Sequence, residues 1–416
     1  MKYPIKYICG AGVMNCPSEK FERRAKFLET SLNQTAPILG ETGIDGVLLD
    51  FNYGLRLQIP EGNWHVRIAD AESEYVFFDE DVSRTTLISW EKFLIEWEIT
   101  IWKDGEPVFY HQFDPRRQNV HFKFMRSMLG DTLALLPYIE AFRKQFDCAV
   151  SCSIAEAFHG IVEHYYPNLR LTEELPDDSY ACFYMWMTFN LPFSAIEDAA
   201  RISLLRMGQA ILRHIKRPPK VIFTPTKSRE IAEPYVCIGV QGSSPSKGWL
   251  APGGWDEVVD YLRSLDYRVL CIDQHRVCSD QFNAIEMPRG AEDMSGNYTL
   301  LDRINQLAYA DFFIGISSGL SWLAWAVDIP VVMISGITKP WHEFDTPYRI
   351  NNPLVCHGCF NDFRERDIIH LCPLFKGTKR AFECSKKISA RQVINAIDRL
   401  IADQKLMGGN NIDSSD

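Results

Sequence analysis

The pattern of hydrophobic and polar residues differs between the N-terminal part of the chain and the remainder. Apolar and polar residues alternate over Val47–Tyr110, most clearly at residues 64–68 and 93–102, and turn residues separate these runs. Further along, short apolar strands alternate with longer segments that have a helical pattern. We therefore predict an N-terminal β-rich domain over residues 1–115, followed by α/β units with parallel sheets.

The α/β region is predicted to form two Rossmann-like halves, because a basic, proline-containing stretch at residues 216–226 resembles an interdomain linker. We place the first half at residues 116–230, the second at 231–404, and a disordered tail at 405–416. Ligands of such folds bind at the carboxyl ends of the strands, so the crevice between the halves is the expected active site. The expected strands are 120–124, 149–153, 235–241, 268–273, 312–315 and 330–335, and the expected helices are 18–32, 131–144, 155–164, 195–215, 255–265, 300–308 and 319–327.

The net charge and the amino-acid composition argue against several classes of protein. The formal net charge of −10 over 416 residues argues against a general nucleic-acid binder or a polybasic membrane-surface protein. The most apolar stretch, residues 315–337, is interrupted by Asp328 and Pro330, so no membrane span is predicted. The N-terminus lacks the apolar core of a secretory signal, and with twelve cysteines this favours reduced thiols or metal ligands in the cytoplasm.

Two strand-to-helix junctions offer candidate functional groups. The first places Asp131 in the opening turn of a helix, where the helix dipole favours an ionised carboxylate by about 0.3–1 kcal/mol. This aspartate fits either a helix cap or a catalytic group. The second junction holds Ser317, Ser318 and Gly319, where free amides and hydroxyls suit a diphosphate, with ordinary serine capping as the alternative.

A third candidate is the polar loop from Gln241 to Trp249, which follows the first strand of the second half. Its Lys247 can neutralise a leaving phosphate, although a solvated surface lysine is the simpler alternative. Since this loop and the Ser317–Gly319 junction both end strands of one predicted sheet, they are expected to converge on one ligand.

Four cysteines give the strongest spacing signal in the chain. Cys356 and Cys359 are separated by two residues, Cys372 follows after twelve more and Cys384 after another eleven. The spacing favours a tetrahedral metal site, which an all-thiolate shell makes structural because it leaves no open coordination position. Zinc and iron both suit this donor set.

Together these motifs resemble the bacterial autotransporter heptosyltransferases. The resemblance runs from residues 60–67 to residues 382–384 and is most specific at residues 129–131, 233–238 and 317–326, with Gly290–Asp293 and the cysteine segment completing it. A more distant likeness is to the lipopolysaccharide heptosyltransferases, which carry Asp-Thr-Gly where this chain has Ser317-Ser318-Gly319.

The resemblance implies a GT-B glycosyltransferase with an N-terminal β-rich domain. It implies transfer of heptose from ADP-glycero-manno-heptose to serine hydroxyls of autotransporter adhesin passenger repeats, with inversion at the anomeric carbon and without a catalytic metal. A homo-oligomer, a dodecamer in one type of the family, is also implied, as is structural iron (Fe³⁺) in the cysteine cluster, with zinc as the second choice.

Roles for individual residues follow from the same resemblance. Asp131 is expected to be the general base and Lys247 to contact the donor phosphates, and the four cysteines are expected to ligate the metal. The other expected donor-binding residues are Gln241, Asp273, Asp293, Ser317, Ser318 and Gly319, of which the two aspartates are candidates for contacts with ribose or heptose hydroxyls.

Two rival functions fit part of the pattern. A heptosyltransferase of the lipopolysaccharide core would share the α/β halves, but the β-rich domain and the cysteine finger favour a protein acceptor. A non-catalytic chaperone for exported autotransporters would keep the fold without turnover.

Overall fold

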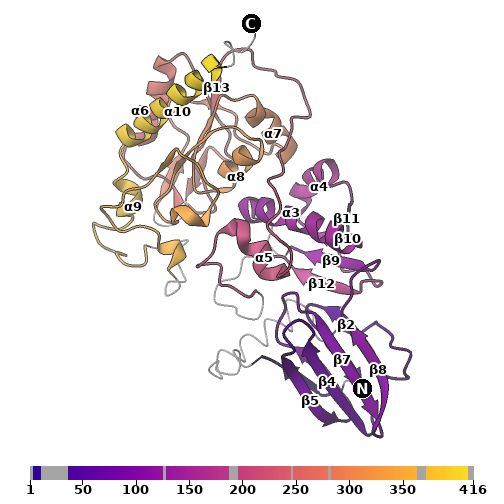
Figure 1. The fold of residues 1–416 in the computed structure, drawn as a ribbon. Coiled ribbons are helices and arrows are strands. Elements are labelled where there is room, and N and C mark those ends of the chain that lie inside the picture. Colours follow the sequence, from indigo (N-terminus) through magenta and orange to yellow (C-terminus); the bar gives the residue numbers. More distant parts are fainter. Residues whose placement is uncertain are drawn as a thin grey trace. The chain divides into compact units, whose positions relative to one another are not determined.

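The computed structural model describes residues 3–10, 36–124, 128–186, 195–244, 247–279, 283–362 and 372–410. The chain forms two compact units (Figure 1). The first unit comprises Met1–Ser127, Leu135–Asp198 and Arg206–Pro218, and the second comprises Met128–Ala134, Ala199–Leu205 and Pro219–Asp416. Within the described ranges, no helix is long and apolar enough to cross a membrane.

The first unit is built on a mixed eight-stranded sheet with the order β1-β6-β3-β2-β12-β9-β10-β11. β12 pairs in parallel with both β2 and β9, and β10 continues the parallel arrangement. The strands span Ile5–Ile8 (β1), Leu48–Asn52 (β2), Arg56–Ile59 (β3), Thr85–Ser89 (β6), Asn119–Lys123 (β9), Ala149–Ser153 (β10), Leu169–Leu171 (β11) and Ala181–Tyr184 (β12).

A second sheet of the first unit is antiparallel and has the order β5-β4-β7-β8. Its strands span Trp64–Asp70 (β4), Val76–Val82 (β5), Trp97–Lys103 (β7) and Glu106–Gln112 (β8). Trp64, Val66 and Ile68 are buried while the residues between them are partly exposed, as the alternating pattern predicts.

The structure differs from the expected separate β-rich domain in one respect. The N-terminal strands β1, β2, β3 and β6 hydrogen-bond into the same sheet as β9–β12, which come from the predicted first α/β half. Pairing between segments far apart in the chain leaves no local pattern in the sequence. The four-stranded antiparallel sheet is formed entirely within the predicted β-rich region.

Three helices lie between or after the strands of the first sheet in chain order. They are α3 (Leu129–Phe146), α4 (His159–Tyr165) and α5 (Met207–Leu212). The opening residues of α3 belong to the second unit and the remainder to the first. The helix expected over residues 195–215 is reduced to α5 and a preceding short 3₁₀ turn, and it ends at Arg213, which has a φ of 34°. The candidate helix at residues 18–32 lies outside the described residues.

The second unit contains a six-stranded parallel sheet with the order β17-β14-β13-β18-β19-β20. Its strands span Tyr235–Gly239 (β13), Arg268–Cys271 (β14), Glu292–Asp293 (β17), Phe313–Ile316 (β18), Val331–Ile334 (β19) and Arg349–Ile350 (β20). β15 (Val277–Ser279) and β16 (Ala284–Glu286) form a separate hairpin.

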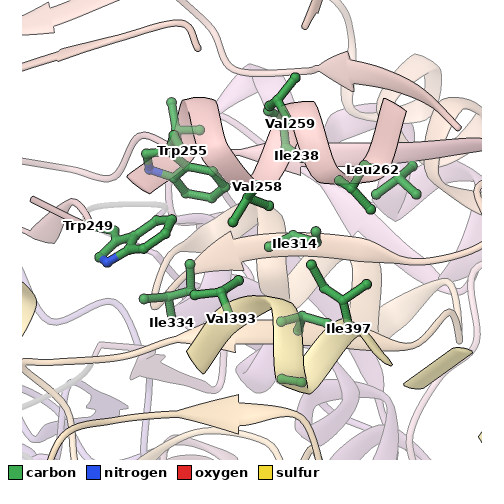
Figure 2. Close-up of a cluster of buried hydrophobic side chains, with 14 of the residues drawn as sticks. Ile238, Trp249, Trp255, Val258, Val259, Leu262, Ile314, Ile334, Val393 and Ile397 are labelled. Atoms are coloured by element: carbon green, nitrogen blue, oxygen red, sulfur yellow. The ribbon is translucent and has the colours of Figure 1, made fainter. Parts of the chain in front are cut away.

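Four helices of the second unit pack with this sheet, and a short helix, α9 (Glu383–Lys386), lies in the cysteine segment. Apolar side chains of α6 and α10 meet those of Ile314 and Ile334 in a buried cluster that also contains Trp249 and Trp255 (Figure 2). The four helices are α6 (Gly254–Ser264), α7 (Leu300–Ala308), α8 (Gly319–Ala326) and α10 (Ala390–Asn410), and α10 extends into the segment predicted as tail.

Candidate active site

The opening turns of α3 and α8 approach each other closely because each carries a glycine. A Cβ on Gly319 would lie 2.6 Å from Cβ of Leu129, and a Cβ on Gly130 would lie 2.8 Å from Cδ1 of Trp322. Neither distance is compatible with a side chain, so only glycine permits this approach. The contact holds Asp131, in the first turn of α3, beside the N-terminus of α8.

Asp131 and Lys247 lie within electrostatic reach of each other. Burial raises the pKa of the half-buried Asp131 to about 6, and the nearby charge of Lys247 opposes this rise. Burial lowers the pKa of Lys247, and Asp131 and Glu343 oppose this shift. The two opposing shifts show that the charges of Asp131 and Lys247 act on each other.

The start of α8 presents polar groups suited to an anion. Ser318 is the N-cap of the helix, with extended backbone angles, but its side chain makes no capping hydrogen bond. In the part of the chain that the structure describes, its hydroxyl is buried without a hydrogen-bond partner. Such a hydroxyl costs about 1–3 kcal/mol, which a ligand oxygen can recover. The first amides of the helix and its dipole favour a negatively charged ligand.

Ser317 plays a different part from Ser318. Its buried hydroxyl donates a hydrogen bond of 2.5 Å to Oε1 of Glu343 and accepts one of 3.1 Å from Thr338. Oε2 of Glu343 accepts hydrogen bonds from Thr338 at 3.1 Å and from Arg349 at 2.8 Å. Ser317 therefore belongs to a buried network beneath the start of α8.

Sequence reasoning missed Glu343, which also influences Lys247. It lies in an irregular loop after β19, and no motif distinguishes this glutamate from a surface residue. The signal that could have found it is positional, because the loops after β18 and β19 end neighbouring parallel strands.

The predicted donor residues Gln241, Asp273 and Asp293 make contacts within the protein. The buried Asp273 carboxylate accepts hydrogen bonds from the amides of Val240 at 2.8 Å and Gln241 at 3.2 Å, tying together the ends of β13 and β14. The Gln241 side chain donates to His275 O. Asp293 is exposed and accepts hydrogen bonds from the amide and hydroxyl of Ser295, which lower its pKa.

The other three cysteines of the predicted metal site lie within electrostatic range of Cys384. Burial raises the pKa of Cys384 to about 12, and the charges of Cys359, Cys356 and Cys372 add to this rise. Across the described residues, no three His, Cys, Asp or Glu side chains are gathered closely enough to form a metal site as they stand. Thiolates are soft ligands, and their mutual repulsion on ionisation is of the kind that a bound cation relieves. Cys356, Cys359, Cys372 and Cys384 form no disulfide bonds.

Two family descriptions match this chain. Residues 43–105 match the N-terminal domain of the glycosyltransferase TibC, and residues 215–369 match glycosyltransferase family 9, the heptosyltransferases. The second match covers the linker, Lys247, the start of α8 and the first part of the cysteine segment.

Individual relatives extend the match over most of the chain. The autotransporter heptosyltransferase BAHTCr of Citrobacter rodentium is 37% identical over 391 residues, which cover 91% of this chain and 94% of the relative. BimC of Burkholderia thailandensis, described as an inactive autotransporter heptosyltransferase, is 33% identical and covers 86% of each chain.

Solved structures agree with these relatives. The crystal structure of TibC from enterotoxigenic Escherichia coli H10407, described as an iron-containing dodecameric glycosyltransferase, superposes with a TM-score of 0.84 at 35% identity, covering 88% of this chain and 98% of TibC. A second TibC structure, in complex with ADP-D-beta-D-heptose, has a TM-score of 0.83 at 34% identity, with 88% and 99% of the two chains covered. The extent of these matches shows that this chain belongs to the autotransporter heptosyltransferase family.

Proposed function

We propose that the chain is a protein O-heptosyltransferase that transfers a heptose from ADP-glycero-manno-heptose to serine hydroxyls of an autotransporter adhesin passenger domain. The observation that carries the proposal is the grouping of Asp131, Lys247 and the polar start of α8 in one place. This grouping provides a base, a cation and an anion-binding helix end, which are the groups that transfer from a nucleotide sugar requires.

The donor diphosphate is proposed to bind at the start of α8. The first amides of the helix and the unpartnered hydroxyl of Ser318 supply donors, and the Lys247 amine supplies positive charge. Charge develops on the departing ADP as the glycosidic bond breaks, so these groups stabilise the transition state more than the ground state. In this proposal Gln241 and Asp273 shape the loop before Lys247, and Asp293 is the exposed candidate for ligand hydroxyls.

Asp131 is proposed as the general base. With a pKa near 6 its carboxylate is mostly ionised at neutral pH yet remains a better proton acceptor than an ordinary aspartate. It accepts the proton of the attacking serine hydroxyl while the serine oxygen bonds to the anomeric carbon, and ADP leaves from the opposite face. The configuration at that carbon is therefore inverted, through a transition state with oxocarbenium character.

We assign a structural metal to Cys356, Cys359, Cys372 and Cys384. Their thiols fit a tetrahedral soft-metal site, and the iron-containing relatives favour iron over zinc. An ion with four thiolate ligands orders the surrounding chain and takes no part in the transfer. Elemental analysis of the purified protein tests the assignment, with about one iron per chain expected and loss of that iron expected in Cys372→Ser.

We also propose a GT-B arrangement and a homo-oligomer of dodecamer size, the latter because TibC is described as dodecameric. Each unit contains parallel strands with crossover helices, as the two halves of a GT-B enzyme do. Light scattering of the purified chain tests the oligomer, because a monomer at working concentration would contradict it.

The rival functions differ in whether the protein transfers heptose and in which acceptor it uses. Since one relative is described as inactive, a chaperone-like role is a specific alternative. The test is incubation with ADP-heptose and a passenger fragment, with lipopolysaccharide core as the competing acceptor and Asp131→Asn as the control. Heptose added to serines of the passenger supports the proposal, whereas heptose added only to the core, or an unmodified passenger bound tightly, supports a rival.

A further inference from the structure

Two residues that directly follow cysteines contact the loop carrying Lys247. The Phe360 ring, next to Cys359, lies with its centroid 5.8 Å from the Lys247 amine. Ser385, next to Cys384, donates a hydrogen bond of 2.6 Å to Gly248 O and accepts one of 2.8 Å from the Leu250 amide. The cysteine segment thus contacts this loop on both sides of residue 248.

Both contacting residues are buried. Phe360 is buried, its amide donates to Ile337 O at 2.9 Å, and its ring packs on His342 with centroids 5.0 Å apart. Ser385 is 5% exposed, so its two hydrogen bonds are shielded from water. A third link follows nearby, where the buried Trp249 indole donates to Ile388 O at 2.9 Å.

Two leucines of the cysteine segment are exposed to solvent. Leu354 and Leu374, which flank the first cysteines and the third, are 91% and 61% exposed. The short α9 begins after Phe382, a non-glycine residue with a φ of 60°. A segment of this kind needs another source of order, and a tetrahedral ion is the source that four neighbouring thiols provide.

We propose that metal bound by the four cysteines fixes the Lys247 loop, and thereby sets the affinity of the protein for the diphosphate of a nucleotide. The inference rests on the proposed function, in which Lys247 contacts that diphosphate. Loss of the ion frees Cys359 and Cys384, and Phe360 and Ser385 move with their neighbours. The Lys247 amine then loses the aromatic face beside it, and residues 248–250 lose their hydrogen bonds.

The first arm of the test uses the full-length protein before and after metal removal by a chelator, with metal content measured. ADP binding is followed by calorimetry, and the rate at which acetic anhydride modifies Lys247 is followed by mass spectrometry. Removal of the metal is expected to weaken ADP binding by about 10-fold or more, because the hydrogen bonds and the aromatic contact that hold the loop are lost together, and to speed modification of Lys247.

The second arm leaves the metal site intact and removes the hydrogen bonds between the cysteine segment and the Lys247 loop. Ser385→Ala removes both hydrogen bonds to the loop and is expected to weaken ADP binding roughly fivefold, with unchanged metal content and faster modification of Lys247. Ser264→Ala is the matched control, because the exposed Ser264 hydroxyl donates to a main-chain carbonyl of α6 away from this loop.

The outcomes are distinguishable. If Ser385→Ala and metal removal both leave ADP affinity and Lys247 modification unchanged, the coupling is wrong. If the metal-free chain unfolds, as circular dichroism would show, Ser385→Ala alone decides. If Lys247→Ala binds ADP like the wild type, the proposed phosphate contact fails, and faster modification of Lys247 on metal removal still supports the coupling.

Discussion

The hydroxyl of Ser317 donates a 2.5 Å hydrogen bond to the carboxylate of Glu343, which lies in the loop after the neighbouring strand. Glu343 also pairs with Arg349 at 2.8 Å, with side chains 4% and 9% exposed respectively. This buried ion pair fixes Ser317, the residue before the N-cap of α8. The geometry of the helix start therefore depends on Glu343, a residue to which the sequence pattern gave no role.

Replacing Glu343 by alanine is expected to lower the free energy of unfolding by about 3–5 kcal/mol. The change would leave the buried Arg349 without its carboxylate partner and the Ser317 hydroxyl without its acceptor. Urea denaturation measures the effect, and Glu286→Ala, an exposed glutamate of β16, is the control. A loss of stability below about 1 kcal/mol is typical of surface ion pairs. It would contradict the conclusion that Glu343 stabilises the start of α8.

The Asp131→Asn variant should separate catalysis from binding. Without a proton acceptor, kcat should fall by about 10²–10⁴-fold. ADP affinity should be maintained or increased, because the negative charge beside Lys247 is removed. Single-turnover assays and calorimetry measure the two quantities, and Glu140→Gln, in the same helix, serves as the control. Wild-type turnover in Asp131→Asn with an intact fold would eliminate the base assignment.

The dependence of kcat/KM on pH should show an acidic limb near pH 6, because kcat/KM reports the ionisation of the free enzyme. Only ionised Asp131 accepts a proton, so activity should fall as the pH drops through its pKa of about 6. Lys247 lowers that pKa, so Lys247→Met should move the limb to higher pH as well as reduce the rate. Rate profiles of both proteins test this, and a limb that stays in place, or moves to lower pH, would show that the two groups do not interact.

Gly319→Ala should disturb the approach of α3 to α8. The new Cβ would lie 2.6 Å from Cβ of Leu129, and such overpacking costs about 1–3 kcal/mol. Activity should fall further than stability because the position of Asp131 changes with the helix start. Gly105→Ala is the comparison: it has open space but a φ of 88°, so it should lose about 1 kcal/mol and retain activity. Equal activity in the two variants would show that the close approach does not position the site.

Much of the second unit could be predicted from the sequence because its elements are marked locally. The helix expected at residues 300–308 agrees with α7, whose Thr299 and Asp302 form a capping box. The proximity of Lys247 to the start of α8 followed from one topological rule, since the loops of parallel strands meet at their carboxyl ends.

The parts that could not be predicted depend on contacts between distant segments. Asp273 was expected at ligand hydroxyls because it ends a strand, but its carboxylate accepts main-chain amides from β13. Ser385 and Phe360 contact the Lys247 loop across more than a hundred residues of chain. Periodicity and capping motifs do not predict contacts between distant segments. Serine and phenylalanine are common in loops, so neither residue type marks such a contact in the sequence.

The pairing of β2 with β12 bears on how the protein is made. Phe51 and Asn52 are paired in register with Ala181 and Cys182, so the central sheet cannot close until the ribosome has released the chain beyond β12. Until then the apolar edge of β2 is open to pairing with other chains. A fragment truncated at residue 115 would carry this edge permanently and should aggregate, whereas one that continues past β12 keeps the edge covered.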